Sequence, residues 1–495
     1  MDRHDIILAS VNRFLQTRRV FVIIVVLGLF TMAARGVKDP DVWWHLRTGQ
    51  LMLATQHAFH TDPYSFTRAE QLWIDHEWLS QVLIFGLYRI AGWGGLIVGF
   101  GVVVAAGFLI TFLRCPGRPY LAGLIILCGA FASAPSWGVR PQMFTFLLAS
   151  VFLLILERSY QRPNLLWWTP FLMLLWVNLH GGYALGIAFL VLFLLGDALD
   201  RGFGLQEASR FRARTVRLAL ALAVCVAVVP LNPYGIRLYW YPLQTLRSQA
   251  MQSYIGEWAS PDFHKPEYLP VLLMMLATLA FPALSPRRLR PRELVLLLTT
   301  TYAALRSVRH IPIYALVAVP ILSTLAQAWW ERRSLSRQPA AKHRLPNRIK
   351  ILVNAALLGG FLVFTIARVH YVVRRQAATE ERNFPAAAVA FLSAVQPPGP
   401  ILNHYNWGGY FIWKLYPQYR VFIDGRADLY GDSFMNELAT AYYLRGSSWQ
   451  ELLEKWSIRT VVLPVDAPLV TALRARPNWK AIHADEQAVV LTRTD

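Results

Sequence analysis

Long apolar segments alternate with short polar segments over the first three quarters of the chain. Apolar runs of roughly 15 to 20 residues, long enough to cross a bilayer as helices, recur from Val20 to about Ile366. The expected spans lie near residues 20–34, 95–113, 120–135, 141–157, 165–178, 182–198, 215–231, 267–282, 292–306, 311–328 and 350–369. The pattern predicts a polytopic α-helical membrane protein with about 11 spans, organised as a multi-span domain over residues 1–370.

One further apolar stretch, residues 78–90, has only about 13 residues and is short for a crossing. We expect a juxtamembrane helix over residues 78–91 instead. With this choice every strongly basic loop lies on the same side as the basic amino terminus, which the positive-inside rule makes cytoplasmic. The basic loops are Arg114 with Arg118, Arg158 with Arg162, and residues 201–217, 287–292 and 332–350. The first loop, residues 35–77, and the carboxyl-terminal region are then external to the inner (plasma) membrane.

The pattern changes near residue 383. Short β-rich runs alternate there with helical patterns, which is typical of an α/β fold. The expected strands are 400–403, 420–423, 460–464 and 488–492, and the expected helices are 384–395, 433–443 and 448–456. We therefore expect a folded external α/β domain over residues 383–495, which is long enough to have its own core.

Composition narrows the class of protein. Hydrophobic residues make up 55% of the 495 residues and charged residues only 16%, which excludes an ordinary soluble globular protein. The net charge of +20 is concentrated in short clusters between apolar runs, as expected for a protein whose partner is the lipid bilayer and not nucleic acid. The three cysteines lie in or beside apolar segments and indicate no disulfide framework.

The first external loop carries the most informative chemistry. Asp39 and Asp41 flank Pro40, which holds the two carboxylates close together in an extended or turn geometry. Such a pair can act as a base or bind a metal, although helix capping or a surface turn is the structural alternative. The loop contains further ionisable groups at spacings that match no metal-site template. These are His45, Arg47, His60, Asp62, Asp75, His76 and Glu77.

Polar residues at the ends of the expected spans gather on the external side. They are Arg140, Asn178, His180, Asn232, Tyr234, Glu257, Trp258, Arg306, Arg309 and His310. Ionisable groups near the membrane tend to line cavities or pair with one another, so a shared external site is expected. The arginines suit the phosphate of a lipid carrier, and they equally suit snorkelling to phospholipid headgroups.

Two motifs in the tail follow strand-like runs. They are Trp407-Gly408-Gly409-Tyr410 and Asp424-Gly425-Arg426-Ala427-Asp428. We expect both to be turns, with one functional carboxylate as the alternative.

Several of these stretches together resemble the GT-C class of integral membrane glycosyltransferases, in a largely uncharacterised bacterial branch. They are Asp39-Pro40-Asp41-Val42-Trp43-Trp44-His45-Leu46, His76-Glu77-Trp78-Leu79, Trp176-Val177-Asn178-Leu179-His180-Gly181-Gly182, and the two tail motifs continued to Leu429-Tyr430. The resemblance covers nearly the whole chain. It implies transfer of a sugar, with inversion, from a polyprenyl-phosphate donor to a glycan, lipid or protein acceptor on the external face.

The resemblance also implies roles for individual residues. Asp39 or Asp41 would act as the base or hold a divalent metal such as Mg or Mn, and Arg140 or Arg309 would neutralise the departing phosphate. The substrate-binding candidates are His45, Arg47, Glu77, Arg140, Asn178, His180, Glu257, Arg306, Arg309 and His310. The acceptor-side candidates are Tyr410, Asp424, Arg426 and Asp428. The tail has no motif that matches the oligosaccharyl or protein mannosyl transferases residue by residue, so the sugar and the acceptor stay unassigned.

Two other classes of function remain open at this stage. A non-enzymatic scaffold would use the external domain to bind a partner, but it would not explain the acidic aromatic first loop. A transporter or flippase would also have polar span ends, yet the chain contains no internal repeat and no matched pair of Gly/Pro-broken spans.

Overall fold

The computed structural model describes residues 15–335, 346–446 and 448–494, and most of these residues are helical. A helix covers each of the eleven apolar stretches expected to span the membrane. The helices are α2 (Thr17–Ala33), α4 (Trp78–Phe112), α5 (Pro119–Ser133), α6 (Gln142–Arg158), α7 (Thr169–Leu179), α8 (Ala184–Gly202), α9 (Ala208–Val228), α12 (Leu269–Leu284), α13 (Pro291–Arg306), α14 (Ile311–Leu335) and α15 (Asn347–Arg374). Within the described residues, six helical segments are long and apolar enough to cross a membrane. The total of about 11 spans stays a prediction.

Helix α4 contains the stretch expected to lie beside the membrane. Its helical dihedral angles are interrupted at Ala91 (φ −138°) and at Gly92 (φ 55°). The positive φ at Gly92 costs little because glycine has no Cβ. The kink separates residues 78–90 from the apolar helix that follows. It lies where the juxtamembrane helix was expected to end.

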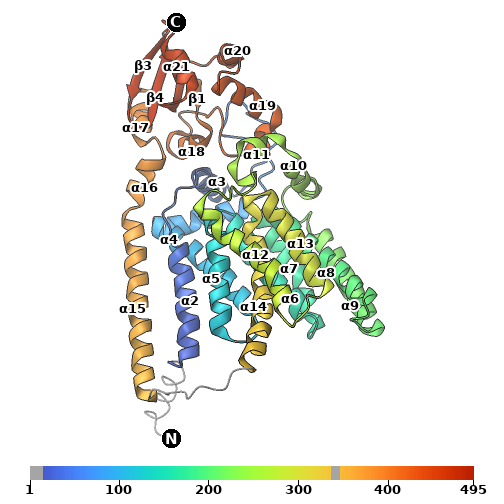
Figure 1. Ribbon diagram of the computed structural model, residues 1–495. Coiled ribbons are helices and arrows are strands. Elements are labelled where there is room, and N and C mark those ends of the chain that lie inside the picture. Colours follow the sequence, from blue (N-terminus) through green and yellow to red (C-terminus); the bar gives the residue numbers. More distant parts are fainter. Residues whose placement is uncertain (1–14, 336–345, 447, 495) are drawn as a thin grey trace.

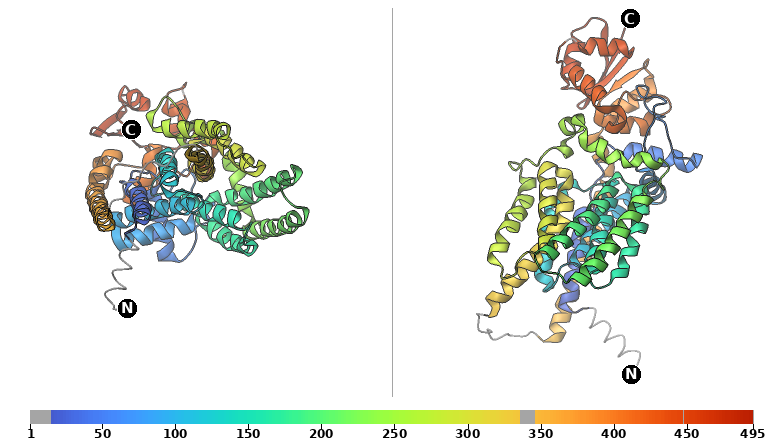
Figure 2. Two further views of the ribbon diagram at one scale, coloured as in Figure 1. Left: turned by 60° about the horizontal axis from the view of Figure 1, so that its bottom comes forward. Right: turned by 90° about the vertical axis from the view of Figure 1, so that its right-hand side faces the viewer.

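The helices form a bundle with the tail at one end (Figure 1). The described amino-terminal residues lie at the opposite end, and the long helix α15 runs along the edge of the bundle toward the tail (Figures 1 and 2). Helix α16 (Gln376–Asn383) then leads into the tail. Three short helices, α3 (Val42–Thr55), α10 (Tyr241–Arg247) and α11 (Gln249–Tyr254), lie between the bundle and the tail.

The tail is built on a four-stranded sheet with the order β1-β2-β4-β3. Strands β1 (Ile401–Asn403) and β2 (Thr460–Pro464) are parallel, whereas β4 (Ala488–Arg493) pairs antiparallel with both β2 and β3 (Trp479–Ala484). The tail helices are α17 (Ala386–Val395), α18 (Gly408–Leu415), α19 (Ala427–Tyr442), α20 (Ser448–Lys455) and α21 (Pro468–Arg474). An apolar core that includes Val461, Leu463 and Leu491 lies within this tail.

Two local predictions for the tail are wrong. The run 420–423 is not a strand of the sheet, because Val421 forms an isolated bridge with the first loop: Val421 N donates to Tyr64 O (3.0 Å) and Phe66 N donates to Val421 O (3.2 Å). The first tail motif is not a turn, since Tyr405–Trp407 is a 3₁₀ helix that continues into α18. The burial of Phe411, Ile412 and Leu415 explains why this segment is helical.

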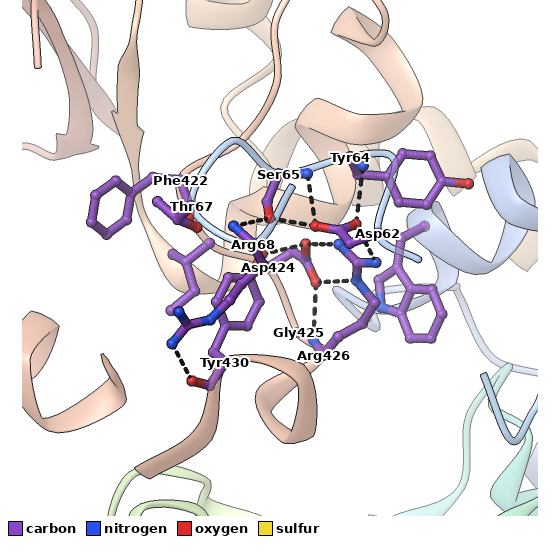
Figure 3. Close-up of polar contacts among 12 residues, drawn as sticks. Asp62, Tyr64, Ser65, Thr67, Arg68, Phe422, Asp424, Gly425, Arg426 and Tyr430 are labelled. Atoms are coloured by element: carbon purple, nitrogen blue, oxygen red, sulfur yellow. Dashed lines mark hydrogen bonds and ion pairs between the residues drawn. The ribbon is translucent and has the colours of Figure 1, made fainter. Parts of the chain in front are cut away.

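A buried ion-pair cluster fastens the first loop to the tail (Figure 3). Arg426 donates from Nη1 to Asp62 Oδ1 (2.8 Å) and from Nη2 to Asp424 Oδ2 (2.6 Å). Two loop side chains also reach the tail backbone, because Thr67 Oγ1 donates to Phe422 O and Arg68 Nη2 donates to Tyr430 O, each at 2.6 Å. The loop and the tail therefore form one continuous structure above the bundle.

Candidate functional site

Two adjoining cavities lie where the bundle meets the tail. The first, which we name the acidic cavity, has a volume of about 420 Å³ and lies between the first loop, the segment 241–258 and the tail motif 425–428. The second, the apolar cavity, has a volume of about 430 Å³ and extends between α6, α8 and the start of α14, where Phe146, Leu185 and Ile313 line it. The two cavities share part of their lining. The shared residues include His76, Arg140, Tyr241, Glu257 and Arg309.

Arg140, just before α6, holds the carboxylates of the acidic cavity. Its Nε lies 2.6 Å from Asp39 Oδ2, its Nη2 lies 3.8 Å from Asp41 Oδ2, and its Nη1 contacts Glu257 Oε1. Asp39 Oδ1 accepts a hydrogen bond from Asp41 N (2.9 Å). Asp41 directly precedes α3, but its side chain makes no capping hydrogen bond with that helix. One guanidinium group thus contacts three carboxylates.

The carboxyl group of Asp41 is a weaker acid than an ordinary aspartate side chain. Burial is the main cause that raises the pKa of Asp41 to about 7, and the negative charge of Asp39 adds to this effect. Arg140 and the hydrogen bond from Trp44 Nε1 to Asp41 Oδ1 (3.2 Å) oppose the increase. A carboxyl group with a pKa near neutral pH is suited to accept a proton from a hydroxyl group.

Glycines of the two tail motifs allow the tail to approach this acidic pair. A Cβ on Gly409 would lie 2.5 Å from Pro40 O, and a Cβ on Gly425 would collide with the Asp41 carboxylate. Only glycine leaves room for such a close approach of the tail backbone. The motifs therefore position the tail against Asp39 and Asp41, which the sequence alone did not indicate.

A second polar cluster surrounds Glu77 at the boundary of the two cavities. Glu77 Oε1 lies 3.3 Å from both His76 Nε2 and His180 Nε2, and Glu77 Oε2 lies 3.7 Å from His45 Nε2. Burial alone would raise the pKa of Glu77, but the three histidines, His76 foremost, hold that pKa below its ordinary value. Burial would lower the pKa of His76, but Glu77 outweighs burial and raises it. For the other two histidines burial prevails, and it lowers the pKa of His45 to about 4 and that of His180 to about 3. Glu77 thus favours a charge on His76, whereas burial disfavours a charge on His45 and His180.

Among the residues that the structure describes, one group has ligand atoms close enough to surround a metal ion. The atoms belong to His76, Glu77 and His180 and lie within 4.8 Å of one another. Gly182 N donates to His180 Nδ1 (2.9 Å), and Thr145 Oγ1 lies 2.8 Å from the same nitrogen. Nδ1 of His180 is therefore an acceptor, so the proton of the ring belongs on Nε2, directed at Glu77, whereas a metal ligand needs that nitrogen bare. In this arrangement the cluster does not fit a resident metal ion, and Asp39 and Asp41 have Arg140 as their positive partner.

The structure brings most of the sequence-predicted site residues to the two cavities. Those that line one or both are Asp39, Asp41, His45, Glu77, Arg140, His180, Glu257, Arg309, His310, Arg426 and Asp428. Five others lie away from these cavities: Arg47 bonds to Gln50 and Tyr416 O, Asn178 to Trp78, Arg306 to Gln252, Tyr410 to Glu380, and Asp424 to Arg426.

The acidic cavity is also lined by residues that were not among those candidates, including His76, Tyr241 and Tyr405. The sequence pointed to His76 only as one ionisable group of the first loop and as part of the stretch His76-Glu77-Trp78-Leu79. Tyr241 stacks on His76 with the ring centroids 4.1 Å apart, and Tyr405 reaches the cavity from the 3₁₀ helix before α18. Neither tyrosine belongs to a motif that the sequence alone distinguishes.

Comparison with known proteins shows which solved structures have a similar fold. No family model and no curated protein matches the chain. Among solved structures, it is similar to the archaeal oligosaccharyltransferase AglB from Archaeoglobus fulgidus in complex with an inhibitory peptide and a dolichol-phosphate, with a TM-score of 0.51 and 10% identity over 90% of this chain and 69% of that chain. The apo form of the Archaeoglobus fulgidus oligosaccharyltransferase gives a TM-score of 0.50 and 12% identity over 91% of this chain and 70% of that chain.

A further match is ArnT from Cupriavidus metallidurans bound to undecaprenyl phosphate, with a TM-score of 0.48 and 15% identity over 95% of this chain and 97% of that chain. The fold of the protein resembles that of the GT-C glycosyltransferases, as the sequence motifs indicated. At such low identity the likeness concerns the fold alone.

Proposed function

We propose that the protein is a membrane glycosyltransferase that moves a sugar from a polyprenyl-phosphate donor to a hydroxyl-bearing acceptor. The observation that carries this proposal is the junction of the two cavities, where an apolar space among the helices meets a polar space with carboxylates and arginines. A lipid-linked sugar has the same division into an apolar chain and a polar head. The similar AglB structure contains a dolichol-phosphate, which agrees with this class of donor.

Arg309 is the better of the two candidate arginines for the donor phosphate. It lines both cavities, and its guanidinium lies over the Trp258 ring, 5.0 Å from the centroid. No carboxylate among the described residues forms an ion pair with Arg309, whereas Arg140 already binds three. A guanidinium without an anionic partner is suited to bind phosphate oxygens. Arg140 then has the role of fixing Asp39 and Asp41.

Asp41 is the proposed base. Its carboxylate takes the proton of the acceptor hydroxyl, whose oxygen forms a bond to the anomeric carbon of the sugar. The bond from that carbon to the phosphate oxygen breaks at the same time, and the phosphate leaves with the electron pair. Attack opposite the leaving group inverts the anomeric centre. The guanidinium of Arg309 stabilises the negative charge that develops on the departing phosphate.

The proposed topology follows from the basic loops. From their charge we infer that the described amino-terminal end and the far end of the bundle lie in the cytoplasm, and that the two cavities and the tail lie on the external side of the inner membrane. The carboxyl-terminal domain then stands directly above the acidic cavity and contributes Tyr405, Arg426 and Asp428 to its lining. This position supports a role in recognising the acceptor, which would be a glycan, a lipid or a protein of the cell envelope.

The direct test is transfer of radiolabelled sugar from polyprenyl-phosphate sugars to envelope acceptors by the purified protein. We expect Asp41→Asn to lower the transfer rate by roughly 10²- to 10⁴-fold, because that is the usual contribution of a general base. Asp466→Asn, at an exposed carboxylate of the tail, is the matched control. Donor binding should persist in Asp41→Asn. An Asp41→Asn protein as active as its control would exclude Asp41 as the base.

A second variant tests the phosphate contact separately. Arg309→Gln should weaken donor binding as well as transfer, because it removes a positive charge that the donor meets already in the ground state. Arg309→Lys should recover part of the binding through its charge. Unchanged donor binding in Arg309→Gln would move the phosphate site to another group of the cavity.

A further inference from the structure

A third cavity lies at the end of the bundle opposite the tail. Its volume is about 740 Å³, and it is enclosed by the end of α6, the end of α8 and the starts of α9 and α13, helices that Figure 1 shows on the side away from α15. Four arginines line it: Arg214, Arg217, Arg290 and Arg292. We name it the basal arginine cavity. It has no part in the proposed sugar transfer, because the acidic cavity lies at the other end of these helices.

One wall of the basal arginine cavity is rigidly built. Arg214 Nε lies 2.7 Å from Asp197 Oδ2, and Arg214 Nη1 donates to Ser159 Oγ (2.8 Å). The ring of Tyr160 is in contact with two guanidinium groups, since its centroid lies 3.4 Å from Arg214 Cζ and 4.0 Å from Arg292 Cζ. These contacts fix the wall before any ligand arrives, which reduces the ordering cost of binding.

The other arginines of the cavity retain capacity to bind an anion. Besides its contact with the Tyr160 ring, Arg292 has a long contact to a carboxylate, with Nε 3.8 Å from Asp200 Oδ2. Arg217 and Arg290 are exposed at the cavity and form no ion pair with a carboxylate in the described part of the chain. The first turn of α13, which begins at Pro291, adds the positive end of its helix dipole. The lining therefore has more positive charge than its own carboxylates can balance.

We propose that the basal arginine cavity binds a phosphate group. Guanidinium groups match phosphate oxygens in geometry and charge, and basic pockets between membrane helices on the cytoplasmic side bind anionic lipid headgroups. The phosphate can belong to an anionic lipid of the inner leaflet or to a soluble phosphate ester. The chemistry of recognition is the same for both sources, and the experiment separates them.

The test uses the full-length protein in a neutral detergent and measures binding by native mass spectrometry. The probes are cardiolipin, phosphatidylglycerol, zwitterionic phosphatidylcholine and glycerol phosphate. We expect binding of at least one anionic probe, and we expect Arg217→Gln and Arg290→Gln each to weaken it by about fivefold. Both side chains are exposed, so the variants should fold, and their unfolding temperatures check this.

The control removes the same charge at the same end of the bundle but outside the cavity. Arg332→Gln and Arg348→Gln, at the end of α14 and the start of α15, should leave binding unchanged. An equal loss in the control pair would reduce the effect to general attraction by a basic surface and overturn the proposal, as would the absence of binding by every anionic probe. Binding of glycerol phosphate identifies a soluble ligand, and binding of the anionic lipids alone identifies a lipid. None of these results depends on sugar transfer.

Discussion

Two arginines of this protein are each surrounded by carboxylates, and they lie in neighbouring parts of the structure. Arg426 of the tail binds Asp62 of the first loop and Asp424 of its own segment. Arg140, before α6, binds Asp39 and Asp41 of the same first loop, and also Glu257. Both clusters thus join the first loop to a distant part of the chain.

The clusters differ in the exposure of their side chains and in the number of carboxylates that share one cation. The side chain of Arg426 is 1% exposed and those of its two partners 0%, whereas that of Arg140 is 17% exposed and its partners 12%, 26% and 36%. Asp424 also accepts hydrogen bonds from Arg426 Nε and Tyr430 OH, so it is fully satisfied. Around Arg140, three carboxylates share one cation beside a cavity. A closed, balanced cluster fastens two parts of the fold, while an open one with excess carboxylate leaves a group available for proton transfer.

Removing the cation of the closed cluster gives the largest expected effect. Arg426→Met leaves Asp62 and Asp424 buried without their partner, which typically costs about 3–5 kcal/mol of unfolding free energy. The measurement is denaturant unfolding, together with proteolysis of the tail. Lys455→Met, which breaks the exposed pair with Glu437, is the control and should cost at most about 1 kcal/mol. Equal stability of the two variants would contradict the role assigned to Arg426.

The next effect concerns the contact between the tail and the open cluster. Gly425→Ala places a methyl group against the Asp41 carboxylate, so this proposed base has to move. A displacement of about 1 Å in a catalytic group can lower the rate by about 10²-fold. Transfer rate and unfolding midpoint should both be measured, and we expect the rate to suffer more. The control is Gly86→Ala in α4, where an added Cβ would meet no atom within 4 Å. A rate that follows stability alone would show that Gly425 serves folding and not the site.

The two clusters also show which features of the structure can be predicted from the sequence and which cannot. Hydropathy predicted the helical bundle, and local patterns predicted β1, β2 and β4, because both depend on residues close together in the chain. The acidic pair of the first loop was recognisable for the same reason. The ion pair between Asp62 and Arg426 joins residues 364 positions apart, and no local pattern encodes such a contact. The run 420–423 was misassigned for that reason too, since its pairing partner belongs to the first loop.

A smaller change in the transfer rate is expected when the pH is varied. The proposed base, Asp41, can accept a proton only when it is deprotonated, and its pKa of about 7 lies above the ordinary value of 3.8. Below that pKa the transfer rate should therefore fall by about tenfold per pH unit as pH decreases, and above it the rate should level off. The profile should be measured between pH 5 and pH 9 with saturating donor. The residual activity of Asp41→Asn should lack this dependence. A wild-type rate that is constant from pH 5 to pH 8 would separate the raised pKa from catalysis.

The smallest expected effect is that of metal removal, and it tests whether the open cluster is balanced by Arg140 or by an ion. Asp39 lies 2.6 Å from Arg140 Nε, so an ion at the acidic pair would have to displace that guanidinium. At the second cluster, Gly182 N keeps Nδ1 of His180 as an acceptor and thereby leaves the proton on the nitrogen that would bind the metal. We expect treatment with a chelator, followed by transfer assays with and without added Mg or Mn, to leave the rate unchanged. Loss of transfer that either ion restores would mean that Arg140 releases Asp39 and Asp41 in the active state, and the open cluster would then be a metal site that the guanidinium occupies at rest.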